Sequence, residues 1–157
     1  MRLRRARPDI EVAPGETALA AAKTADGRSV GGTRDALYAP FRIPWERVEA
    51  ADWDSETSTL RVVETDAEPV TVELEPEEPQ RLLQLIRERV TASVVLQRHV
   101  PVASPLGLRV VARRAPGRRG DLVWSVRYDD GVDPDDPAVR QLVADTLAAA
   151  KSDVGVG

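Results

Sequence analysis

The side chains best suited to chemistry in this chain are arginines and aspartates, which gather in two neighbouring segments. The densest basic cluster comprises Arg109, Arg113, Arg114, Arg118 and Arg119. Guanidinium groups donate paired hydrogen bonds to phosphates and carboxylates, so this cluster is the candidate binding site of the chain. A nucleic-acid backbone would be one ligand of that kind. The plainer interpretation is an exposed hairpin whose charges are solvated or neutralised internally.

The acidic segment from Asp129 to Asp136 suggests calcium at first sight. Its aspartates do not have the spacing of an EF-hand loop, which also requires a glutamate at the twelfth position. A helix N-terminus explains the same residues better. Asp133 or Asp136 would be the N-cap, with the proline that follows each of them at the first helical position. No metal site is expected here.

The remaining motifs point away from catalysis. His99 is the only histidine, and no Gly-x-Ser-x-Gly sequence supplies a serine nucleophile for it. We interpret His99 as an ordinary residue near the end of a helix. Gly31 and Gly32 do not belong to a phosphate-binding loop and predict a bulge or a sharp bend in a strand. The sequence therefore predicts no catalytic, cofactor-binding or metal-binding residue.

Composition limits the class of protein further. The chain has 157 residues, no cysteine and a formal net charge of −4. The absence of cysteine excludes disulfides and thiolate metal sites, and favours a reducing compartment. The basic start leads into Pro8 and Asp9, where a signal peptide would have an apolar run. We therefore expect a cytoplasmic protein without a transmembrane segment.

These side chains must be positioned by a β-rich first half. Alternating apolar residues and turn signals predict five strands there. They cover Thr17–Thr24, Arg28–Tyr38, Glu46–Trp53, Thr59–Glu64 and Val70–Leu74. An Asp-Gly pair at residues 26 and 27 predicts a tight hairpin turn between the first two. The three tryptophans, Trp45, Trp53 and Trp124, lie in or beside predicted strands and are expected in the core.

The periodicity then changes to that of a helix. Apolar residues from Leu82 to Val94 lie on one helical face and predict a helix over about residues 78–97. Leu108–Arg114 and Leu122–Tyr128 predict a hairpin, and a second amphipathic stripe from Val139 to Ala150 predicts a final helix. Sequential strands with late helices indicate the α+β class.

The segment Gly32-Thr-Arg-Asp-Ala-Leu-Tyr38, followed by Ile43-Pro-Trp-Glu-Arg-Val48, resembles bacterial pleckstrin-homology-like domains over roughly residues 16–98. The resemblance implies a strongly bent antiparallel sheet or barrel with a covering helix, used for binding more than for catalysis. Such domains have seven strands before the helix, whereas five are predicted here. The hairpin of residues 108–128 either completes the barrel or belongs to a separate lobe.

Three segments follow from this organisation: a flexible basic arm over residues 1–14, a β-rich domain over 15–100, and a hairpin with a helix over 101–157. The leading hypothesis is a non-catalytic cytoplasmic module that binds or scaffolds a protein partner. A second copy of the chain would be one such partner. The alternative is a nucleic-acid-associated protein that uses the cluster from Arg109 to Arg119. A third hypothesis is a small enzyme that works with carboxylates and arginines.

Overall fold

The computed structural model describes residues 10–76 and 79–155. Most of the basic arm predicted over residues 1–14 lies outside them. The chain divides into two compact units. Unit 1 comprises residues 1–93 and 114–121, and unit 2 comprises residues 94–113 and 122–157. The first change of unit therefore comes at residue 93, seven residues before the predicted boundary at residue 100.

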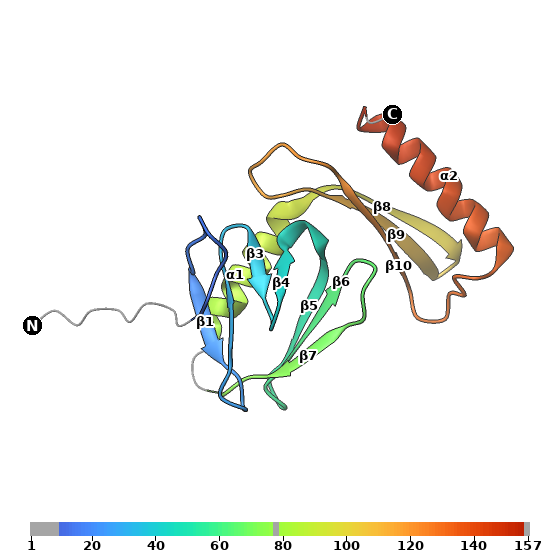
Figure 1. Cartoon of the computed structure of the whole chain (residues 1–157). Coiled ribbons are helices and arrows are strands. Elements are labelled where there is room, and N and C mark those ends of the chain that lie inside the picture. Colours follow the sequence, from blue (N-terminus) through green and yellow to red (C-terminus); the bar gives the residue numbers. More distant parts are fainter. Residues whose placement is uncertain (1–9, 77–78, 156–157) are drawn as a thin grey trace, which may run out of the picture. The chain divides into compact units, whose positions relative to one another are not determined.

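Unit 1 begins with a four-stranded antiparallel sheet (Figure 1). Its strands, in spatial order, are β1 (Ala20–Lys23), β2 (Ser29–Gly32), β3 (Ala36–Tyr38) and β4 (Arg42–Pro44). The predicted hairpin turn is confirmed, and Gly27 in it has a φ of +85°. The single strand predicted over residues 28–38 is wrong. Thr33 Oγ1 accepts hydrogen bonds from the amides of Asp35 and Ala36, both at 3.1 Å, and this turn separates β2 from β3.

A second, three-stranded antiparallel sheet follows a short 3₁₀ helix at Trp45–Arg47. Its strands are β5 (Val48–Asp54), β6 (Thr59–Glu64) and β7 (Val70–Glu73). The end of β7 meets the end of β1 through a single bridge between Leu74 and Thr24. The described part of unit 1 thus has seven strands before its helix, where five were predicted, and they form two sheets with no closed barrel.

The core of unit 1 lies between these sheets and helix α1 (Gln80–Ser93), which contacts β1, β2 and β5. Leu82 and Ile86 on the helix are buried against Trp45, which is fully buried. The glycine pair forms no bulge, because β1 and β2 keep an unbroken register, but the chain turns directly after Gly32, as the alternative of a sharp bend predicted. A Cβ atom at Gly32 would lie 2.9 Å from Leu85 Cδ2 and 3.1 Å from Trp45 Cζ2. Glycine here allows the helix to approach the sheet.

Helix α1 ends four residues earlier than predicted, because Val94 starts a strand. β8 (Val94–Ala103) has half-buried and exposed side chains in alternation over most of its length. Val94 and Val95 are β-branched, which lowers helix propensity and suits a pleated sheet. The interpretation of His99 as a helix-end residue is therefore wrong, since it lies in β8 opposite Arg109.

Unit 2 is a three-stranded antiparallel sheet with one helix packed on it (Figure 1). Strands β8, β9 (Leu106–Arg113) and β10 (Val123–Tyr128) lie with β9 in the middle. Helix α2 (Pro137–Asp153) buries Val139 against Leu108 and Val110. The capping prediction is confirmed, because the Asp136 carboxylate accepts a hydrogen bond from the Ala138 amide at 2.8 Å.

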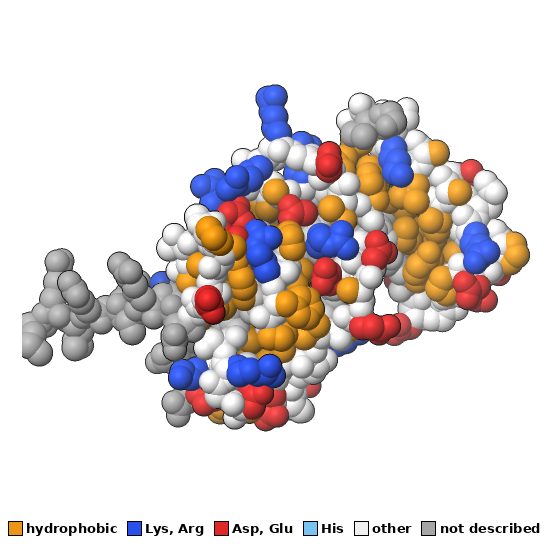
Figure 2. All heavy atoms as spheres, in the orientation of Figure 1, with side chains coloured by type: hydrophobic (Ala, Val, Ile, Leu, Met, Phe, Trp, Pro, Cys, Tyr) orange, Lys and Arg blue, Asp and Glu red, His pale blue; other side chains and the backbone are white. Residues whose placement is uncertain are grey.

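Much of the apolar cluster in unit 2 stays partly exposed, including Trp124, Tyr128 and Leu142. Figure 2 shows hydrophobic side chains gathered where α2 meets the sheet. The hairpin of residues 108–128 thus pairs with β8 in this unit and adds no strand to the sheets of unit 1. The α+β class is confirmed. No helix in the described parts of the chain has the length and apolar character to cross a membrane.

Candidate functional site

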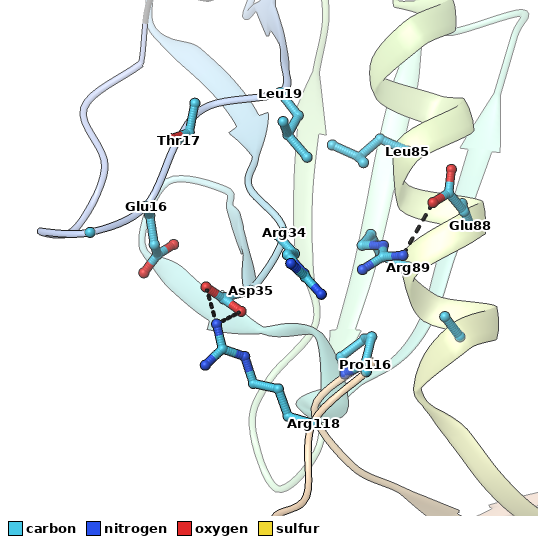
Figure 3. Close-up of a pocket in the computed structure, with 13 residues that line it drawn as sticks. Glu16, Thr17, Leu19, Arg34, Asp35, Leu85, Glu88, Arg89, Pro116 and Arg118 are labelled. Atoms are coloured by element: carbon cyan, nitrogen blue, oxygen red, sulfur yellow. Dashed lines mark hydrogen bonds and ion pairs between the residues drawn. The ribbon is translucent and has the colours of Figure 1, made fainter.

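A pocket of about 590 Å³ opens in unit 1 on the side of α1 that faces the turn between β2 and β3 (Figure 3). Four separate segments contribute to its walls, and we call it the arginine pocket. The four segments are the chain before β1, the turn between β2 and β3, helix α1 and a later loop. In that order they supply Gly15, Glu16, Thr17 and Leu19; Arg34 and Asp35; Leu85, Glu88, Arg89 and Ala92; and Pro116, Gly117 and Arg118. The last segment is the loop between β9 and β10, which belongs to unit 1.

Three arginines and three carboxylates line the pocket. Arg118 is held by Asp35, with 3.1 Å between Nη2 and Oδ1. Arg89 donates to Glu88 at 3.2 Å, but its own side chain is only 18% exposed whereas that of Glu88 is 64% exposed. Within the described residues, the Arg34 side chain forms no hydrogen bond or ion pair. Figure 3 shows the guanidinium groups of Arg34 and Arg89 projecting into the same space between turn and helix.

An apolar wall lies beside these charges. Leu19, just before β1, is 46% exposed although it is a large aliphatic residue. In Figure 3 its side chain and that of Leu85 on α1 lean toward one another across the pocket. Pro116 forms part of the opposite wall near Arg118. The pocket therefore presents guanidinium donors and an aliphatic surface side by side.

Glu16 lines the pocket and holds neighbouring segments of unit 1 together through its carboxylate. Its carboxylate accepts hydrogen bonds from Thr33 Oγ1 at 2.7 Å, from Arg42 Nε at 2.9 Å and from the Tyr38 hydroxyl at 3.0 Å. Burial by itself would raise the pKa of Glu16, but these three donors together outweigh it and hold the pKa below its ordinary value. The network ties the segment before β1 to β3 and β4.

The stability of unit 1 should therefore fall as the pH falls below about 4.3, the ordinary pKa of a glutamate. A carboxyl group whose pKa is depressed by folding stabilises the folded state above its unfolded pKa, and this contribution is lost as pH drops through the folded pKa. Glu16→Gln should be less stable than the wild type at pH 7 and lose less on acidification. Urea unfolding at pH 7, 5 and 3 measures both. Equal pH dependence of the two proteins would contradict this role of Glu16.

A second depression, of about 820 Å³, runs between β5 and the neighbouring face of α1, and we call it the β5–α1 groove. Ala51, Trp53, Leu83 and Val90 line it and are only partly buried. Exposed polar residues stand at its rim, among them Asp52, Gln84 and Arg87. β5 is the edge of its sheet, and its outer side from Ala50 to Asp54 pairs with no other strand in the described residues.

The arginines singled out from the sequence do not share one environment. Arg109 is exposed on β9, whereas Arg113 on the same strand is 5% exposed and donates to Ser125 Oγ at 3.0 Å. Arg114, Arg118 and Arg119 lie in the loop assigned to unit 1. Arg114 donates its amide to the Ser93 carbonyl, and the Arg118 side chain is paired with Asp35. Of the cluster, Arg118 lines the arginine pocket, and no member lines the β5–α1 groove.

The acidic segment is used in local structure. Asp129 accepts a hydrogen bond from the Gly107 amide at 2.8 Å, and Asp133 accepts one from the Asp135 amide at 2.9 Å. With Asp136 at the N-cap of α2, three of these carboxylates hold backbone amides. Of the tryptophans, Trp45 is confirmed in the core, whereas Trp53 and Trp124 are half-buried. Lys151 lies over the ring of Trp124, 5.7 Å from its centroid.

Sequence reasoning missed the contributions of Glu16 and Arg89, because no local pattern links them to Arg34. Comparison with protein families, curated proteins and solved structures finds no match for this chain. The two depressions in unit 1 are the candidate functional sites of the described residues.

Proposed function

We propose that this protein is a non-catalytic module that binds a partner protein, and that the β5–α1 groove takes an extended segment of that partner. The observation that carries this proposal is an open strand edge beside a groove with an apolar floor. The outer edge of β5 offers backbone donors and acceptors that an added strand can use.

The side chains of the groove define the segment that would fit. Ala51 and Trp53 are two residues apart on β5 and face the core side of the sheet with Leu60 and Val62. An added strand presents its own side chains with the same period of two. Alternate apolar side chains of the partner would therefore cover Trp53, Leu83 and Val90, and the polar residues between them would face solvent.

The element order of unit 1 supports the same proposal. Seven strands followed by one helix is the order implied by the resemblance to pleckstrin-homology-like domains, a scaffold used mainly for binding. The burial of Arg113 and the pairing of Arg118 leave fewer free cations than a nucleic-acid site built on the cluster from Arg109 to Arg119 would require. A protein partner thus remains the leading proposal over nucleic acid.

A phage-displayed library of random linear peptides, selected against the full chain, tests the groove. Gln84→Trp fills the groove from an exposed position on α1, and Arg81→Trp adds the same bulk to the same helix away from the groove residues. We expect selected peptides with alternating apolar residues, which bind the wild type and Arg81→Trp but lose about tenfold or more in affinity for Gln84→Trp.

Amide exchange measured by nuclear magnetic resonance gives a second readout. Peptide binding should slow exchange at amides between Ala50 and Asp54, since new hydrogen bonds form at that edge. Peptides that bind Gln84→Trp as well as the wild type, peptides that bind as helices, or a library without any binder would each overturn the proposal.

A further inference from the structure

The guanidinium groups of the arginine pocket are only partly neutralised by its carboxylates. The carboxylate of Glu16 is occupied by Arg42, and that of Asp35 by Arg118. Glu88 is the remaining partner, but its carboxylate is largely solvent-exposed, and an exposed pair of this kind contributes little. Arg34 and the mostly buried Arg89 are left with most of their hydrogen-bond donors unused.

Two guanidinium groups that face the same space repel each other, and the repulsion grows as water is displaced. An anion between them removes that cost and accepts charge-assisted hydrogen bonds from both sides. Arginine suits this task because its planar donors match the two oxygens of a carboxylate. The geometry in Figure 3, with both groups directed into one cavity, is that of an anion-accepting pair.

The rest of the pocket limits the kind of anion. Asp35 and Glu88 lie in its walls and oppose a second negative charge, so a monoanion fits better than a phosphate dianion. Leu19 and Leu85 provide an aliphatic surface next to the guanidinium groups. An apolar chain of the ligand would cover these two leucines and remove them from water. A volume of about 590 Å³ lies in the range of pockets that hold small organic molecules.

We therefore propose that the arginine pocket binds a small organic carboxylate with an apolar chain, its carboxylate between Arg34 and Arg89 and its chain against Leu19 and Leu85. Arg118, fixed by Asp35, closes the wall beside the carboxylate. This site is separate from the β5–α1 groove, with which it shares no lining residue.

Titration of the ¹⁵N-labelled full chain with octanoate, at concentrations below its micelle formation, tests this site. We expect saturable shifts of the amides of Arg34, Asp35, Leu85 and Arg118. Inorganic phosphate and octan-1-ol, which carry the charge and the chain separately, should each bind about tenfold more weakly or worse, because each lacks one half of the contacts. Phosphate that binds as tightly as octanoate would overturn the assignment of a carboxylate with a chain.

Two variants locate the carboxylate. Arg34→Gln changes an exposed residue and should preserve the fold, while Arg34→Gln with Arg89→Gln removes both guanidinium groups. Octanoate affinity should fall about tenfold in the first and further in the second. Arg61→Gln removes an exposed arginine of β6 outside the pocket and should leave affinity unchanged, as should Gln84→Trp in the groove. Equal octanoate affinity of Arg34→Gln and wild type, or no saturable binding, would overturn the proposal.

Discussion

Trp45→Ala is expected to destabilise unit 1 by about 3–5 kcal/mol, a large share of the roughly 5–15 kcal/mol that holds a typical domain together. The Trp45 side chain is fully buried at the point where the 3₁₀ helix, β2 and α1 meet. Its removal leaves a cavity, because the surrounding elements relax only partly into the space. Its indole nitrogen also donates to the Thr33 carbonyl at 2.9 Å. The substitution therefore creates a cavity and also leaves the Thr33 carbonyl without its hydrogen-bond donor.

Trp45→Phe separates the two effects. Phenylalanine keeps an aromatic ring in the site but cannot donate a hydrogen bond, so the loss should be smaller and should include about 1–3 kcal/mol for the unpaired Thr33 carbonyl. Phe41→Ala is the matched control, since that ring is 51% exposed, and should change stability by about 0.5 kcal/mol or less. Urea unfolding followed by circular dichroism measures all three. A loss below about 1 kcal/mol for Trp45→Ala would contradict the central place of this residue.

Val139→Asp is expected to have the second large effect, a loss of several kcal/mol in unit 2 at pH 7. Val139 is 5% exposed and packs on Leu108 and Val110, so the introduced carboxylate would be buried without a partner. The loss should diminish as the pH falls toward 4, because burial raises the pKa of a carboxyl group and the neutral acid is less costly to bury.

Ala138→Asp is a control in the same helical turn. Ala138 is exposed, and its position near the N-terminus of α2 suits a negative charge. We expect this variant to keep the wild-type stability, so the difference between the two substitutions isolates burial from helix propensity. Thermal unfolding at pH 7 and pH 4 provides the comparison. Similar stability of both variants at pH 7 would contradict the packing of α2 on β9.

Patterns that lie within one element predicted the structure well. The apolar stripe of α2 runs from Val139 to Ala150 within one 17-residue helix, and the N-cap at Asp136 is defined by its immediate neighbours. β6 and β10 follow from alternation along each strand, and the turn-forming residues between β9 and β10 predict their hairpin. The start of β8 was misassigned because Val94 continues the helical stripe of Leu82, Ile86 and Val90 while it also begins an alternating run.

The candidate sites depend on contacts that no local pattern records. Arg34, Arg89 and Arg118 are brought together by the packing of α1 on the first sheet and by a loop from a distant part of the chain. Glu16 stands alone in the sequence, and its three donors lie 17 to 26 residues away. The arginine cluster predicted from density along the chain is divided, because Arg109 and Arg113 lie on β9 in unit 2 whereas the loop that follows, with the other three arginines, belongs to unit 1.

The loop that carries Arg118 limits how the gene of this protein can recombine during evolution. The chain passes between the two units at residues 93/94, 113/114 and 121/122, because a segment of unit 1 is inserted into the hairpin of unit 2. A gene fragment that ends at Ser93 encodes the two sheets and α1 but lacks the Pro116 and Arg118 wall of the arginine pocket. Unit 2 therefore cannot be lost or exchanged as a cassette without altering the pocket, and recombination should preserve the two units as a single heritable block.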